Sequence, residues 1–180
     1  MNQKIDGNIK NKINEDLSPT KNLIGLHLKI VTSIAIIWSL FQLWYVSPFP
    51  FMFDFGMFKG LPARAIHLGF ALTLTFLIFP YSKGKKISII DISISLIAAF
   101  CCLYIYFFYD QLVYRGGILL SFNLNESINI PIELIIGIIG ILILLEATRR
   151  AIGLPLVIIA ISFLLFSYFG KYAPDIISHG

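Results

Sequence analysis

Charged residues are scarce in this chain: Asp, Glu, Lys and Arg together make up 13% of its 180 residues. Hydrophobic residues make up 57% and the mean hydropathy is +0.83, whereas a soluble domain is typically about 45–50% apolar. The apolar residues form long blocks that are separated by short charged breaks. This pattern argues against a soluble globular domain and is typical of a membrane protein.

Cysteine is almost absent, since the chain has only the adjacent Cys101 and Cys102, inside an apolar run. Two neighbouring cysteines supply neither a disulfide framework nor the ligand spacing of a metal site. We interpret them as small residues of a packed helix surface. No metal and no cofactor is therefore expected.

Motifs of the common enzyme classes are also absent from the sequence. It has no Walker A loop, zinc-hydrolase spacing, nucleophile elbow or Gly-rich dinucleotide fingerprint, and so nothing indicates an enzyme or an ATP-driven pump. The net charge of +4 comes from basic residues at the ends of the apolar blocks. Membrane orientation explains that placement better than nucleic-acid binding does.

The apolar blocks predict an all-α integral membrane bundle of about five transmembrane helices, at 26–46, 63–79, 87–109, 130–145 and 155–169. The second block has about 15 apolar residues, or roughly 23 Å of helix, which is short for a hydrocarbon core of ~30 Å. It can span the core if the aliphatic stem of Arg64 extends toward the interface.

Three regions follow from this pattern. Residues 1–25 are polar and rich in Asn and Lys, which predicts a disordered cytoplasmic tail rather than a cleaved signal peptide. Residues 26–150 hold four of the predicted helices, and residues 151–180 hold one more.

Lysine and arginine alternate between rich and poor breaks along the chain. The N-terminal tail and the breaks that contain Lys83, Lys85 and Lys86, and Arg149 and Arg150, are rich; the breaks with Lys59, Arg115 and Lys171 are poor. Because cytoplasmic loops carry the excess of basic residues, the N-terminus is predicted inside and the C-terminus outside.

Small and polar residues form one stripe on each of the first four segments, since spacings of three and four share a helix face. Such stripes are expected to face other helices, because lipid gives no hydrophobic drive for association and small residues allow close approach. The stripes are Thr32, Ala35, Ser39 and Gln42; Arg64, His67, Ala71 and Thr75; Ser88, Asp91, Ser95, Ala98 and Cys102; Glu133, Gly137 and Gly140. Gly137 is predicted to be the most sensitive of these positions to a larger side chain.

Several charged residues allow both a functional and a structural interpretation. Asp91 could serve an ion or proton site, or pair with a nearby lysine at the cytoplasmic interface. Arg64 and His67 could bind an anionic group, or anchor the helix at the interface and form a hydrogen bond to another helix. Glu146 has the i,i+3 and i,i+4 spacing for ion pairs with Arg149 and Arg150, at a helix end that also marks topology.

Four pieces of the sequence, in order, resemble the beginning of a fused TRAP transporter permease (tripartite ATP-independent periplasmic transporter) of the TAXI type. The resemblance extends from about Leu26 to Gly180. The pieces are Trp38–Leu43 (WSLFQL), Arg64–Leu68 (RAIHL), Leu145–Gly153 (LEATRRAIG) and Phe169–Tyr172 (FGKY).

This resemblance implies a bacterial or archaeal inner-membrane protein that forms the scaffold part of an ion-gradient-driven solute uptake transporter. The implied partners are a large permease part, a periplasmic substrate-binding protein and membrane lipid. The Gly- and Ser-rich hairpins that hold substrate and sodium in the family are not in this sequence, so no substrate residue carries over. The chain is expected to be a fragment, a split gene product or a truncated reading frame.

Two other classes stay open. One is a small multi-pass membrane assembly or interaction protein unrelated to transport. The other is a lipid-modifying membrane enzyme, which would need polar residues clustered at one depth; the predicted topology places Asp91 and Arg64 on opposite sides.

Overall fold

The computed structural model describes residues 25–58, 60–81, 88–116, 118, 121–125 and 128–170. The expected disordered tail lies outside these residues. The elements are α2 (Leu26–Val46), α3 (Phe49–Phe53), α4 (Gly60–Ile78), α5 (Ile89–Tyr114), β1 (Ser121–Asn125), β2 (Ile128–Pro131), α6 (Ile132–Ala151) and α7 (Leu154–Phe169). The fold is therefore helical, as predicted, apart from one short antiparallel hairpin formed by β1 and β2.

Local sequence explains where several helices begin and end. The hydroxyl of Ser88 accepts a hydrogen bond from the Ile90 N–H and so caps the start of α5, which satisfies one of the free amides there. Gly153, at φ 110°, separates α6 from α7. This is a conformation that residues other than glycine rarely adopt.

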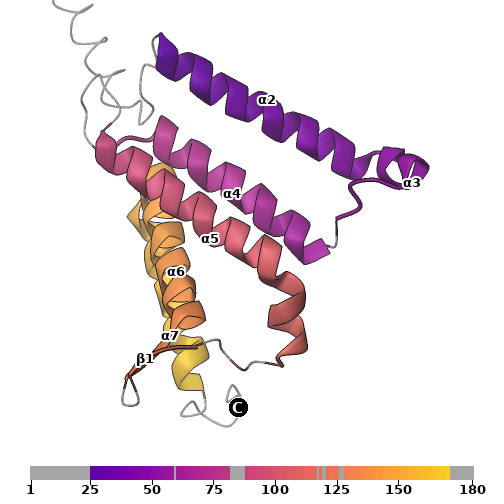
Figure 1. The fold of residues 1–180 in the computed structure, drawn as a ribbon. Coiled ribbons are helices and arrows are strands. Elements are labelled where there is room, and N and C mark those ends of the chain that lie inside the picture. The colour runs from indigo at the N-terminus through magenta and orange to yellow at the C-terminus, as the bar shows by residue number, and fades with distance from the viewer. Residues whose placement is uncertain are drawn as a thin grey trace, which may run out of the picture.

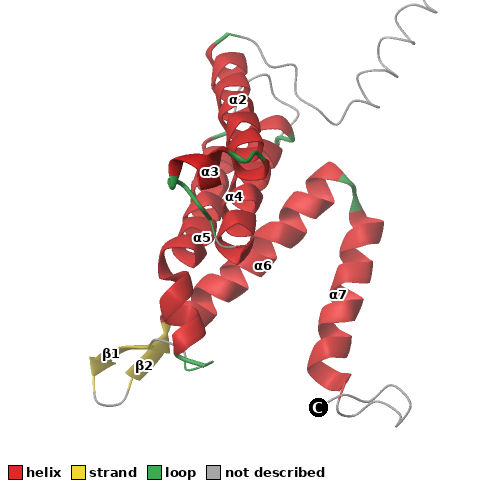
Figure 2. Cartoon of the chain, turned by 90° about the vertical axis from the view of Figure 1, so that its right-hand side faces the viewer, coloured by secondary structure: helices red, strands yellow, loops and turns green. Residues whose placement is uncertain are grey.

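The helices α4 and α5 form the closest pair, and α2 lies against α4 (Figure 1). The helix α6 contacts both α4 and α5, and α7 contacts α6. Figure 2 shows α6 running obliquely past the other helices and α7 turning back from its end, apart from α4 and α5.

The core lies where α4, α5 and α6 meet. It consists of Leu72, Phe76, Ala98, Cys102, Ile143 and Ala147. The helices α4 and α5 come close together at Gly69, where an added Cβ would lie 3.2 Å from the Cβ of Cys102. A glycine at position 69 therefore allows this pair to pack tightly.

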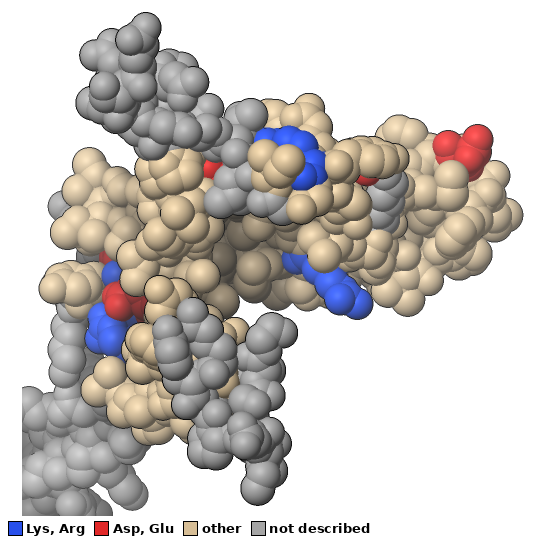
Figure 3. Space-filling view, turned by 90° about the horizontal axis from the view of Figure 1, so that it is seen from below, with Lys and Arg blue, Asp and Glu red and all other residues tan. Residues whose placement is uncertain are grey.

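Apolar side chains cover most of the exterior. Val31 is the one buried residue of α2, and Val157 is the one buried residue of α7. Figure 3 shows a face with a few scattered charged groups among uncharged residues. Three helices, α2, α4 and α5, are long and apolar enough to cross a membrane. The helix α6 carries charged residues near both ends, and α7 has 16 residues.

Candidate functional site

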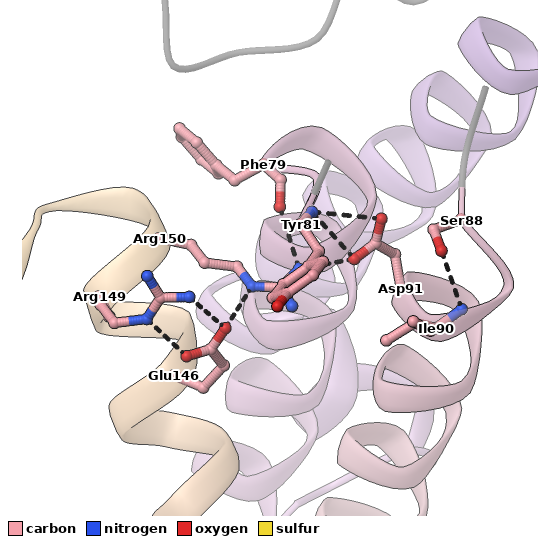
Figure 4. Close-up of polar contacts among 8 residues, drawn as sticks. All are labelled: Phe79, Tyr81, Ser88, Ile90, Asp91, Glu146, Arg149 and Arg150. Carbon is pink, nitrogen blue, oxygen red and sulfur yellow. Dashed lines mark hydrogen bonds and ion pairs between the residues drawn. The ribbon is translucent and has the colours of Figure 1, made fainter. Parts of the chain in front are cut away.

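The side chain of Arg150, near the end of α6, joins three helices (Figure 4). Its Nη1 donates to Asp91 Oδ1 of α5 at 2.7 Å and to the carbonyl oxygen of Phe79, just after α4, at 3.3 Å. Its Nε donates to Glu146 Oε1, one turn earlier in α6, at 2.7 Å. The Arg150 side chain is 4% exposed. We call this buried set of contacts, formed by Arg150 with Asp91, Glu146 and Phe79, the junction.

Asp91 is the other buried member of this junction, with 1% of its side chain exposed. Besides the bond from Arg150, the backbone N–H of Tyr81 donates to its two oxygens at 3.2 and 3.4 Å. A buried carboxylate is tolerated when it is paired and hydrogen-bonded. The partner of Asp91 in the structure is therefore an arginine that lies 59 positions later in the sequence. Whether a lysine also pairs with Asp91, as predicted, is not tested, because Lys83, Lys85 and Lys86 lie outside the described residues.

Aromatic rings cover the Arg150 guanidinium. Its carbon lies 5.0 Å from the ring centre of Phe76 and 5.6 Å from that of Tyr81. Cation–π attraction is strongest where the cation is removed from water, as here. The rings both stabilise the charge and exclude solvent from its bond to Asp91.

Arg149 forms the exposed edge of the same cluster. Its Nε and Nη2 donate to the two oxygens of Glu146 at 2.7 and 2.8 Å. Both predicted spacings, i,i+3 and i,i+4, thus carry ion pairs. Glu146 lies beyond the apolar run expected to cross the membrane. The hydrogen bonds from Arg149 and then Arg150 lower the pKa of its carboxyl to about 2, so it stays ionised at neutral pH.

A second ion pair lies at the opposite end of α6. Arg115, just after α5, donates from Nη2 to Glu133 Oε1 at 2.6 Å, and the Tyr104 hydroxyl donates to the same oxygen at 3.2 Å. The Glu133 side chain is 3% exposed. Glu133 belongs to a predicted stripe, but no rule of spacing pairs it with Arg115. The two residues flank the same predicted loop, and this nearness along the chain does not by itself pair them.

Gln42 and His67 meet between α2 and α4. The Trp38 indole N–H donates to His67 Nδ1 at 3.3 Å, and the Gln42 amide lies 3.4 Å from the imidazole. The Trp38 ring also packs edge-on against His67. Arg64 is one turn away on α4 and exposed, and its side chain takes part in none of the hydrogen bonds found in the described part of the chain. His67 thus serves a helix contact that Arg64 does not share.

Gly137 and Gly140 have no close helix contact among the residues that the structure describes. A Cβ on either glycine would have no atom within 4 Å, whereas one on Gly69 would press on Cys102. The stripe on α6 is visible in the sequence, but the sequence does not specify which helix comes near it. The predicted contact of these two glycines with a partner stays a prediction.

The charged groups of the site link helices to one another. In the described residues no group of three or more His, Cys, Asp or Glu is placed to hold a metal ion. Cys101 and Cys102 are free and buried. The carboxylates of Asp91, Glu133 and Glu146 each bind an arginine. The charges therefore hold helices together at both ends of α6.

Comparisons with protein-family models, with curated proteins and with solved structures found no match to this chain.

Proposed function

We propose that this chain is the membrane scaffold part of a TRAP-type, ion-gradient-driven solute uptake transporter, and that a separate large permease part binds and moves the substrate. One observation carries the proposal. The longest of the four pieces that resemble the family, Leu145–Gly153, contains Glu146, Arg149 and Arg150. Glu146 binds both arginines, and Arg150 joins α6 to α5 and to the residue that follows α4.

This observation favours a scaffold because of how the charges are used. A transport site needs polar groups that are available to an ion or solute. Here Asp91 and Arg150 are buried and bound to each other. A network that is satisfied in this way fixes the positions of helices instead.

The alternative is a small multi-pass assembly protein unrelated to transport. The largely apolar surfaces of α2 and α7 favour it equally, because lipid or any membrane partner could cover them. The two proposals differ in whether solute uptake by a permease depends on this chain.

We expect the purified chain, reconstituted alone in liposomes, to show no sodium-dependent solute uptake. Together with a large TRAP permease part and its substrate-binding protein, it should support uptake. The control is the permease reconstituted without this chain. Uptake by the chain alone would exclude the scaffold role. An assembly protein would leave the permease's uptake unchanged whether present or absent.

We further propose an inner-membrane location with five crossings, with the N-terminus in the cytoplasm. The alternation of lysine and arginine supports it. Cysteines introduced at Asn2 and Ser178, both outside the described residues, should differ in labelling by an impermeant reagent on intact cells. Ser178→Cys is expected to react and Asn2→Cys to stay protected. Labelling of both positions, or of neither, would contradict an odd number of crossings.

A further inference from the structure

The segment between α2 and α4 has a structure suited to lipid. We call residues 46–58 the aromatic connector. It contains the short helix α3 and, within these residues, a single ionisable side chain, Asp54. Five of its thirteen residues are phenylalanines, at positions 49, 51, 53, 55 and 58. This composition is unusual for a connection that lies in water.

Several apolar side chains of the connector are largely exposed. Phe51 is 78% exposed, Phe55 is 73% exposed and Met52 is 71% exposed. Such a contiguous exposed apolar surface marks a contact with a membrane or another molecule. On the inner side, the ring of Trp44 packs against Phe49, Phe53 and Phe55, at 6.2 to 6.4 Å between ring centres. The connector is thus an ordered aromatic cluster attached to the end of α2.

Most backbone N–H groups in the first part of the connector, from Ser47 to Phe55, form hydrogen bonds within the chain. The N–H groups of Phe51, Met52, Asp54 and Phe55 donate to carbonyl oxygens of Pro48 or Pro50. Ser47 N–H donates to α2 and Phe49 N–H to the Ser47 hydroxyl, and Pro48 and Pro50 have no N–H. Irregular backbone in contact with lipid is costly when its donors need water, and here these donors are satisfied within the chain.

We propose that the aromatic connector lies in the membrane interface, with Phe51, Met52 and Phe55 inserted at the boundary between lipid headgroups and acyl chains. The bilayer around the chain is the partner. This proposal rests on the membrane location proposed above, but not on the transporter role or on the orientation of the chain. Phenylalanine-rich apolar faces of this kind insert about 5–10 Å into that boundary.

Insertion would give α2 a second support. Within the described chain α2 packs against α4 and α3, and its one buried residue is Val31. An inserted connector fixes the end of α2 at the interface, as aromatic anchors do for other transmembrane helices. The tilt of α2 is then set by lipid as well as by α4.

Spin-label accessibility in liposomes of phosphatidylethanolamine and phosphatidylglycerol tests this proposal. Single cysteines replace Phe51, Phe55, Asp54 or Phe100 in a chain with Cys101→Ala and Cys102→Ala, and each carries a nitroxide. Phe100, near the middle of α5 and 60% exposed, is the lipid reference. Asp54, the ionisable residue of the connector, is the reference nearer to water. Labels at positions 51 and 55 should collide more often with oxygen than with a water-soluble nickel complex. Their ratio of oxygen to nickel collisions should lie between the ratios at positions 100 and 54.

Two results would overturn the proposal. Nickel accessibility at 51 and 55 as high as in water would place the connector outside the bilayer. Low accessibility to both reagents, with an immobilised label, would mean that protein covers it. If the background variant is less stable than the parent, the same labels are introduced with the native cysteines kept. The parent treated with the reagent then gives the background signal.

Discussion

Replacing Arg150 with methionine is expected to destabilise the folded chain by about 3–5 kcal/mol, because it leaves the Asp91 carboxylate buried without its cation. The substitution keeps most of the side-chain volume, so the lost charge accounts for the effect. It also leaves the carbonyl of Phe79 without this donor. The measurement is unfolding in mixed micelles, supported by thermal aggregation in detergent.

Two further variants separate the buried ion pair from a general loss of charge. Arg149→Met removes a cation that is 43% exposed, and exposed pairs contribute about 0–1 kcal/mol. The double variant Arg150→Met with Asp91→Leu should recover most of the loss, since replacing both partners of a buried pair by apolar residues is often neutral. Equal effects of Arg149→Met and Arg150→Met would show that the junction is not buried in the folded protein.

The long helices could be predicted from the sequence because the hydropathy of each block exceeds that of its breaks. The predicted range 26–46 coincides with α2, and the other helices differ from their predictions by a few residues at the ends. The helix α6 continues to Ala151, beyond the apolar run, because Glu146, Arg149 and Arg150 are good helix formers. Hydropathy alone ends a segment at its first charge.

The two short elements were missed for different reasons. Pro48 and Pro50 follow the first apolar block, where proline usually ends a helix. Proline is also favoured in the first turn of a helix, and here Pro48 is the N-cap residue of α3 and Pro50 lies in its first turn. The hairpin had a signal in its alternation: Phe122, Leu124, Ile128 and Ile130 are interleaved with Ser and Asn. Period-two alternation across a two-residue break is typical of a hairpin.

Ion pairs within one helix could be predicted from the sequence, but ion pairs between helices could not. Spacing within one helix predicted both pairs of Glu146, because residues three and four apart are neighbours. The bond between Arg150 and Asp91 joins residues 59 positions apart, and the one between Arg115 and Glu133 crosses the hairpin. Such partners depend on how helices are arranged. A single sequence does not specify that arrangement.

Substitution of Gly69 by leucine is expected to destabilise the chain by about 1–3 kcal/mol through overpacking. The reason is the Cys102 Cβ, 3.2 Å from where the first added carbon would lie. Gly69→Ala should be close to the parent in stability, because a shift of a few tenths of an ångström relieves that contact. Alanine is also favoured over glycine inside a helix by about 1 kcal/mol.

Gly137→Leu is the matched control, at the stripe position that the sequence predicts to be the most sensitive to a larger side chain. The new side chain at position 137 would extend into open space in this chain, so its thermal aggregation in detergent should match that of the parent. Ile138→Leu, on a neighbouring exposed position, should match as well. A loss at Gly137→Leu equal to that at Gly69→Leu would show that another helix or a second copy covers the Gly137 face. No loss at Gly69→Leu would mean that α4 and α5 are further apart than the contact with Cys102 requires.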